Sequence, residues 1–199
     1  MKPALTVEVA SDSLERIRAD VLVVGVAPTD RPLRGAAGYA DWRLCGRLWE
    51  LVSAGRIPGV RGQASLVIPG GGLQTRLLLV LGLGQRHLLD LSAWQELGRD
   101  ATDRSLGLRA ETVALAIVQD GLIDRPTAHQ ERSEAVAGLI SGAARAVGVR
   151  GTCLRLTLLG TPSAVIEDAL VPAGVEVRLP GSTPSTKLPS APSGTQAPV

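Results

Sequence analysis

Residues 19–26, ADVLVVGV, and residues 76–82, RLLLVLG, decide the fold class. Each is an almost uninterrupted apolar run, and the first is closed by Pro28. Strands that are buried on both faces have this pattern, whereas a strand with one wet face alternates apolar and polar residues. Two such runs favour a sheet covered by helices on both faces. We therefore predict an α/β fold.

The rest of the chain supplies further strands and helices around these two runs. Leu5, Val7 and Val9 alternate with polar neighbours and predict an edge-like strand. Residues 63–68 and 76–82, joined by the Gly-rich segment PGGGLQ, predict an antiparallel hairpin. We also expect strands at 112–118, 153–159 and 175–177, and helices at 36–54, 92–106, 130–147 and 163–169.

The predicted helix at 36–54 carries two apolar rows. One contains Ala40, Leu44, Leu48 and Leu51, and the other contains Trp42, Cys45, Trp49 and Val52. This apolar face is wider than one sheet contact requires. Two interpretations remain open: both rows pack in the core, or the tryptophan row contacts another subunit, since Trp is favoured at interfaces. The candidate interface residues are Trp42, Trp49, Arg43 and Arg47.

Two later helices have distinctive ends or faces. Ser92, with Gln95 three residues on, predicts a capping box at the start of the helix over 92–106. The helix over 130–147 has small residues, including Gly138 and Gly142, along one line. We expect these small residues to allow a close approach to the sheet.

Composition indicates one globular domain. Hydrophobic residues make up 45% and charged residues 20% of the 199 residues. Residues 180–199 are rich in Pro, Ser and Thr and predict a disordered tail, which leaves residues 1–179 as the domain. No stretch resembles a signal peptide or a membrane helix. With only two cysteines, both expected as small core residues, a cytoplasmic protein is predicted.

Charge gives little reason to expect a nucleic-acid partner. The formal net charge is +2, so no strong overall field is predicted. Arginines give residues 31–62 a local positive excess, which we interpret as a solvated rim.

No catalytic, cofactor-binding or metal-binding constellation is visible in the chain. Residues 70–72 are three glycines, but they lead into a strand rather than into a helix, as a phosphate-binding loop would. Gly82 and Gly84 lack the third glycine of a dinucleotide fingerprint. His87 and His129 have no neighbours at metal-ligand spacing. We predict no cofactor and no enzymatic activity.

Four stretches together resemble the N-terminal domain of leucyl (cytosol) aminopeptidases. They are ADVLVVGV at 19–26, LWELVSAGRIPGVRGQ at 48–63, RLLLVLGLGQ at 76–85 and GTCLRLTLLG at 151–160. The resemblance implies a three-layer α/β/α fold related to macrodomains, with a mixed, mostly parallel central sheet. It also implies that this domain bears no catalytic residue, because the two-metal site of the family belongs to a larger C-terminal domain.

Four functions are open at this point. A non-catalytic domain that acts by protein association, as an accessory subunit or by self-association, is the leading hypothesis. The resemblance to macrodomains raises binding of a nucleotide or ADP-ribose, although the chain has no Asn for the Asn-containing segment that macrodomains use. DNA binding, which some bacterial aminopeptidases show, is the third. A hydrolase assembled from residues distant in sequence would be detected by aminopeptidase assays with added metal.

Overall fold

The computed structural model describes residues 4–10, 13–118, 128–169 and 171–179. The strands are β1 Ala4–Ala10, β2 Val21–Val26, β3 Ala64–Val67, β4 Leu77–Gly82, β5 Thr112–Ala116, β6 Cys153–Leu159 and β7 Glu176–Arg178. The helices are α1 Gly35–Arg43, α2 Arg47–Ser53, α3 Leu91–Gly107, α4 Ala128–Arg150 and α5 Ser163–Glu167, with a 3-10 turn, η1, at Arg86–Leu88. The predicted tail at 180–199 lies outside the described residues.

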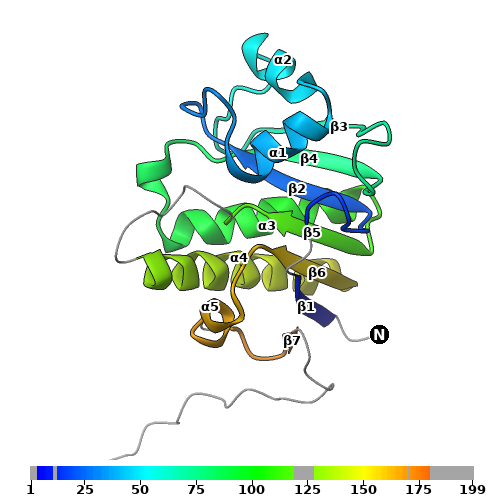
Figure 1. The fold of residues 1–199 in the computed structure, drawn as a ribbon. Helices are drawn as coiled ribbons and strands as arrows, with labels where there is room; N and C mark the ends of the chain where they lie inside the picture. The colour runs from blue at the N-terminus through cyan, green and yellow to red at the C-terminus, as the bar shows by residue number, and fades with distance from the viewer. Residues whose placement is uncertain (1–3, 11–12, 119–127, 170, 180–199) are drawn as a thin grey trace, which may run out of the picture.

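The seven strands form one sheet in the order β3-β4-β2-β5-β6-β1-β7 (Figure 1). All pairs are parallel except β3 with β4, which is the predicted hairpin. β2 lies between β4 and β5, so its residues Val21 to Val24 have neither an edge nor a wet face and are fully buried. The mixed, mostly parallel sheet predicted from the sequence is confirmed.

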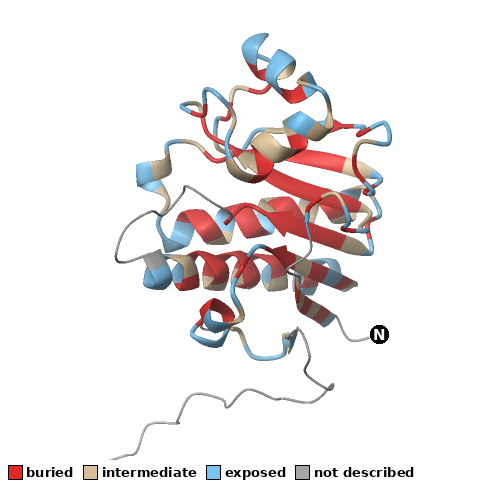
Figure 2. Ribbon diagram, viewed as in Figure 1, coloured by how far each residue is buried: buried red, intermediate tan, exposed pale blue. Residues whose placement is uncertain are grey.

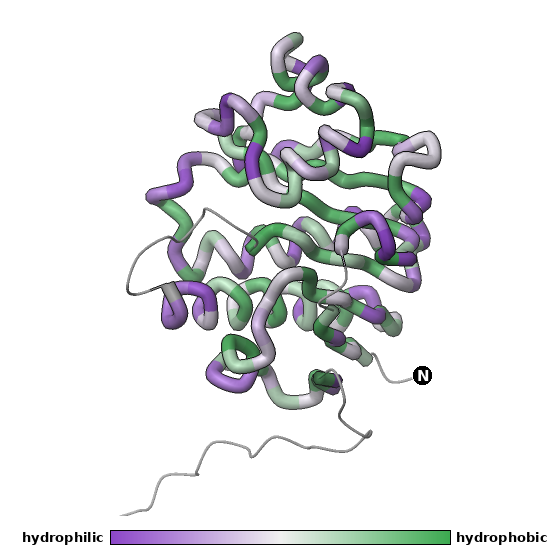
Figure 3. Tube along the Cα trace, viewed as in Figure 1, coloured by the Kyte–Doolittle hydropathy of each residue, from purple (hydrophilic) through white to green (hydrophobic). Residues whose placement is uncertain are grey.

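Helices cover both faces of the sheet, which gives three layers. On one face, α3, α4 and α5 bury an apolar cluster that includes Trp94, Leu139 and Ile166 against the strands. On the other face, α1 and α2 bury Ala40 and Leu48 against β2 and β4. The central strands β2, β4 and β5 are almost continuously buried and hydrophobic, whereas the end of α2 is exposed (Figures 2 and 3).

Strand β1 is not at an edge of the sheet. Its alternating pattern is present, with Leu5, Val7 and Val9 buried, but the strand pairs with β6 on one side and with β7 on the other. β7 is only three residues long, and it is β7 that occupies the edge. An alternating apolar and polar pattern shows that one face of a strand is exposed to solvent. It does not show where the strand lies in the sheet, so the prediction of an edge position was wrong.

The close approach of the small residues in α4 is to helix α3 and not to the sheet. A Cβ on Gly142 would overlap the carbonyl oxygen of Gln95, and a Cβ on Gly98 of α3 would overlap the backbone of Leu139. A Cβ on Gly138 would lie 2.6 Å from the Cβ of Trp94. The two helices therefore pack backbone to backbone.

Two further sequence predictions are corrected at the chain's caps and turns. Helix α3 is capped by Asp90, whose Oδ1 accepts a hydrogen bond of 2.8 Å from the amide of Ala93, and not by Ser92. Cys45 is exposed in a turn with φ 56°, so it is not a core residue, and Cys153 is only partly buried.

Candidate functional site

The predicted helix at 36–54 is broken into α1 and α2 by a turn at residues 44–46. Cys45 and Gly46 adopt positive φ values of 56° and 85° there. A left-handed residue cannot continue a right-handed helix, and glycine tolerates that conformation best. The break changes the direction of the chain, so the two apolar rows do not form one continuous face.

The break divides the two rows unequally between core and solvent. Ala40 and Leu48 are buried, whereas Trp42 is 67% exposed and Trp49 is 39% exposed. Only Val52 of the tryptophan row is fully buried. The expectation that both rows pack in the core is therefore wrong for the tryptophans. We call Trp42, Trp49, Arg43 and Arg47 the tryptophan surface.

Trp42 is held by contacts on two sides. Its ring centroid lies 5.6 Å from that of Tyr39, with the planes tilted by 56°, and the guanidinium carbon of Arg43 lies 5.6 Å from the ring centroid. These are distances at which aromatic pairs and cation–π pairs attract each other. The Tyr39 hydroxyl in turn donates a hydrogen bond of 2.6 Å to Glu15, which lowers the pKa of Glu15 and raises that of Tyr39.

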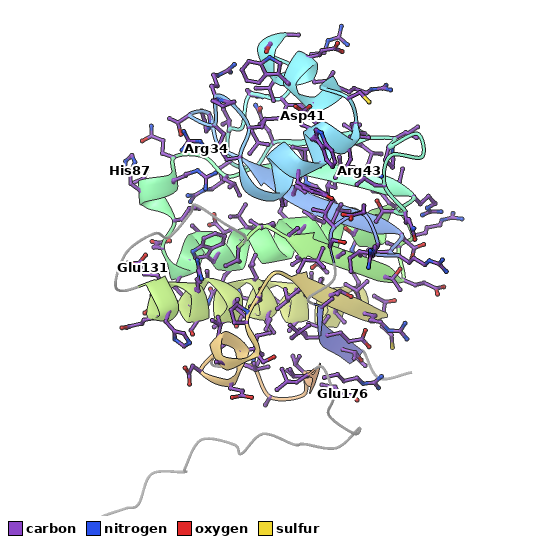
Figure 4. The ribbon with its side chains drawn as sticks, in the orientation of Figure 1. Arg34, Asp41, Arg43, His87, Glu131 and Glu176 are labelled. Carbon is purple, nitrogen blue, oxygen red and sulfur yellow. The ribbon has the colours of Figure 1, made fainter. Side chains whose placement is uncertain are left out.

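Arg43 and Arg47 differ in their surroundings. Arg43 is partly buried, and its Nε donates a hydrogen bond of 3.1 Å to the carbonyl of Gly72 in the Gly-rich loop. A Cβ on Gly72 would lie 2.5 Å from the carbonyl oxygen of Arg43, so a larger residue would not fit beneath α1. Arg47 is exposed at the start of α2. Arg34, Asp41 and Arg43 lie at this end of the molecule, far from Glu176 (Figure 4).

The structure places Arg43 against Trp42 and ties α2, which carries Arg47 and Trp49, to α1 through Asp41. It also adds three residues that were not predicted from the sequence. Tyr39 orients Trp42, Asp41 binds the backbone of α2, and Gly72 fixes Arg43. Gly46 was the available signal for the break between α1 and α2, because a glycine within a predicted helix lowers its stability.

The carboxyl ends of β2 and β4 are covered by the chain itself. This edge is where ligands bind in open α/β sheets. Here residues 59–61 lie against the strand ends: a Cβ on Gly59 would lie 2.7 Å from the carbonyl carbon of Ala27, and a Cβ on Gly82 would overlap the backbone of Val60. The Gly84 amide also donates to the Gly59 carbonyl at 2.9 Å.

The polar groups at the same edge bind one another. Asp30 is 6% exposed, and its carboxylate accepts two hydrogen bonds from Arg86, at 2.9 and 2.7 Å, and one of 2.8 Å from the Ala27 amide. This bidentate pair fixes the loop after β2 to η1. His87 lies on η1, away from the tryptophan surface (Figure 4).

The described residues contain neither a metal-binding cluster nor a membrane-spanning helix. No group of three or more His, Cys, Asp or Glu side chains in this part of the chain is placed to hold a metal ion. Among the helices of the same part, none is both long and apolar enough to cross a membrane.

Comparison with known proteins identifies a related family. Residues 23–150 match the model of the N-terminal domain of the cytosol aminopeptidase family. A probable cytosol aminopeptidase from Alkaliphilus oremlandii (strain OhILAs) is 22% identical over 114 residues, which cover 57% of this chain and 23% of that protein. The chain therefore spans less than a quarter of the length of this curated relative.

Solved structures with the same fold come from two groups. A tomato leucine aminopeptidase mutant superposes with a TM-score of 0.65 and 17% identity, covering 82% of this chain and 34% of that one. The macrodomain of Mycobacterium tuberculosis DarG gives a TM-score of 0.59 and 14% identity, covering 78% of this chain and 98% of that one. A macrodomain mutant from Oceanobacillus iheyensis gives a TM-score of 0.58 and 13% identity, covering 80% of this chain and 85% of that one.

At these identities the structural likeness establishes the fold alone, and that fold is macrodomain-like. The family match covers more than half of the chain and includes α1, α2, β3, β4, α3, β5 and α4. The chain belongs to the cytosol aminopeptidase family, in which it corresponds to the N-terminal domain.

Proposed function

We propose that this domain acts by protein association, without catalysis of its own, and that the tryptophan surface is where the partner binds. The exposure of Trp42, at 67%, carries the proposal. Large aromatic side chains left in water are enriched at interfaces and dominate binding energies there. Trp42 is also already oriented by Tyr39 and Arg43, so little side-chain freedom remains to be lost on binding.

The charges around the two rings indicate the kind of partner. Arg43 lies against the Trp42 ring, Arg47 is exposed two residues before Trp49, and the carboxylate of Asp41 is already used by the backbone of α2. A partner face with an apolar pocket bordered by carboxylates complements this arrangement. The partner is either a second copy of this chain or a separately encoded subunit.

Light scattering after size-exclusion chromatography tests self-association. The wild type is compared, over a range of concentrations, with a double variant, Trp42→Ala with Trp49→Glu. Val149→Glu is the matched control, because Val149 is 78% exposed on α4, on the opposite face of the sheet. We expect the double variant, and not the control, to reduce the mass of any assembly.

A separate subunit is tested by co-purification of the three tagged proteins from the native cell, quantified by mass spectrometry. We expect a partner that is retained by the wild type and the control, lost from the double variant, and weakened by Arg47→Glu. A wild type that is monomeric throughout and retains the same proteins as the double variant would refute association at this surface.

A further inference from the structure

A second polar site lies at the amino-terminal edge of the sheet, at the opposite end of the strands from their carboxyl ends. A shallow, open cavity of about 460 Å³ lies between the starts of β2, β4 and β5. Its polar lining residues are Arg18, Asp20, Gln74, Thr75, Arg76 and Thr112.

Thr75 is the residue of this cavity that the fold itself does not explain. It is 4% exposed, and its hydroxyl makes no hydrogen bond within the described residues. Leaving a buried hydroxyl unpaired is costly, and native proteins seldom do so without a reason. A valine would have the same shape without that cost. The Thr75 hydroxyl thus lies in the lining of the cavity with its hydrogen-bonding capacity unused.

Two arginines give the cavity an excess of positive charge and of hydrogen-bond donors. Arg18 Nε donates to Gln74 Oε1 at 3.2 Å, and one terminal nitrogen of Arg76 donates to the carbonyl of Leu108 at 3.3 Å. A guanidinium has five N–H donors, so each of these contacts uses only a small part of the supply. The remaining donors suit an oxygen-rich anion, which arginine recognises in a bidentate manner.

The single carboxylate of the cavity is engaged in holding strands together. Asp20 Oδ2 accepts hydrogen bonds from the Glu111 amide at 2.9 Å, from the Thr112 amide at 3.0 Å and from the Thr112 hydroxyl at 3.0 Å. Burial raises the pKa of Asp20, but these hydrogen bonds together with Arg76 outweigh it, so the pKa is lowered. The cavity lining thus carries one negative charge, on Asp20, and two positive charges, on Arg18 and Arg76, so its net charge is positive.

We propose that this cavity binds the oxyanion group of a small molecule, a phosphate or a carboxylate, with Arg18 and Arg76 as its charge partners and the Thr75 hydroxyl as a hydrogen-bond partner. This site is independent of protein association at the tryptophan surface. It is built from three chain segments.

Titration with simple anions, followed by NMR of the backbone amides, tests the site. Sodium phosphate and sodium acetate are added separately at ionic strength matched with sodium chloride. We expect saturable shifts at residues 74–76 with one of the two oxyanions beyond those with chloride. Saturation by phosphate identifies a phosphorylated ligand, and saturation by acetate identifies a carboxylate. Shifts no larger than those with chloride overturn the proposal.

Two variants and a control make the test specific. Arg76→Gln and Thr75→Val should each weaken the anion by about tenfold, as expected for hydrogen bonds to a charged group. Arg145→Gln removes the same charge from an exposed position on α4 and should leave the affinity unchanged. Equal weakening by Arg145→Gln would show a general charge effect and overturn the site.

The melting temperature of Thr75→Val separates ligand binding from a structural role. Without anion, we expect the variant to melt at the same temperature as the wild type or above it, because the hydroxyl it removes has no bond within the described residues. A lower melting temperature together with unchanged affinity would show that Thr75 stabilises the fold instead.

Discussion

The carboxylate of Asp41 accepts a hydrogen bond of 2.8 Å from the backbone amide of Trp49, eight residues further along the chain. The residue before α2 is Gly46, which has no side chain to cap the helix. Asp41 therefore satisfies, from α1, one of the amides that a helix start leaves unpaired. The same bond fixes α2, and with it Trp49, relative to α1 and Trp42.

Asp41→Ala should destabilise the domain by about 1 kcal/mol, the usual cost of losing a helix cap. Asp41→Asn keeps an acceptor oxygen and should recover most of that loss. Urea unfolding of the two variants and the wild type measures both differences. Equal destabilisation by Ala and Asn would show that the negative charge, and not the hydrogen bond, holds α2 in place.

The contact between α3 and α4 predicts that alanine substitutions at two glycines of α4 have opposite effects on stability. Gly142→Ala should lower stability by about 1–3 kcal/mol, because the new methyl group overlaps the Gln95 carbonyl and forces the helices apart. Gly148→Ala, with open space around its Cβ, should raise stability by up to about 1 kcal/mol through helix propensity. Thermal unfolding gives both signs, and a stabilised Gly142→Ala would contradict the close packing.

The sequence predicted the strands well and the helical contacts poorly, for a physical reason. A strand such as Val21–Val26 is buried on both faces, so its own composition carries the signal. Gly142 was recognised as a site of close approach, but its partner, Gln95, is remote in sequence and leaves no trace in the periodicity of α4.

The same difference, between a signal carried by one stretch of sequence and a contact between remote residues, explains why the candidate site was only partly predicted. Trp42 and Trp49 were visible as an apolar row, but two hydrogen bonds help to hold α1 and α2 in place: the Trp49 amide donates to Asp41, and Arg43 donates to the Gly72 carbonyl. Both bonds need the folded chain. The oxyanion cavity is assembled from three strand starts, so no single stretch of sequence could contain it.

Asp20 predicts a dependence of stability on pH. Its pKa is lowered in the folded protein, so its contribution is present above the unfolded-state pKa of about 3.9 and is lost as pH falls through the folded-state value. Asp20→Ala should cost about 1–3 kcal/mol at pH 7, and the difference from the wild type should shrink below about pH 4. Urea unfolding in phosphate-free buffers across this range measures it.

Asp100→Ala is the control for that titration. Asp100 forms an exposed pair with Arg104 on α3, at 2.7 Å, and such helix pairs contribute about 0.3–0.5 kcal/mol. Its effect at pH 7 should be correspondingly small. A difference between wild type and Asp20→Ala that stays constant down to pH 2 would show that packing, and not the ionised carboxylate, is responsible.

The covered carboxyl edge predicts that the domain does not bind ADP-ribose there, although a macrodomain of the same fold from Oceanobacillus iheyensis has been solved with ADPR. Residues 59–61 lie against the ends of β2 and β4, and Arg86 is paired with Asp30. Opening this edge would require separating this partly buried ion pair. Calorimetric titration with ADP-ribose should therefore give no heat of binding at high micromolar concentration. Saturable heat that is abolished by Arg86→Gln, and not by Arg76→Gln, would show that the edge opens. Nucleotide binding would then replace protein association as the proposed function.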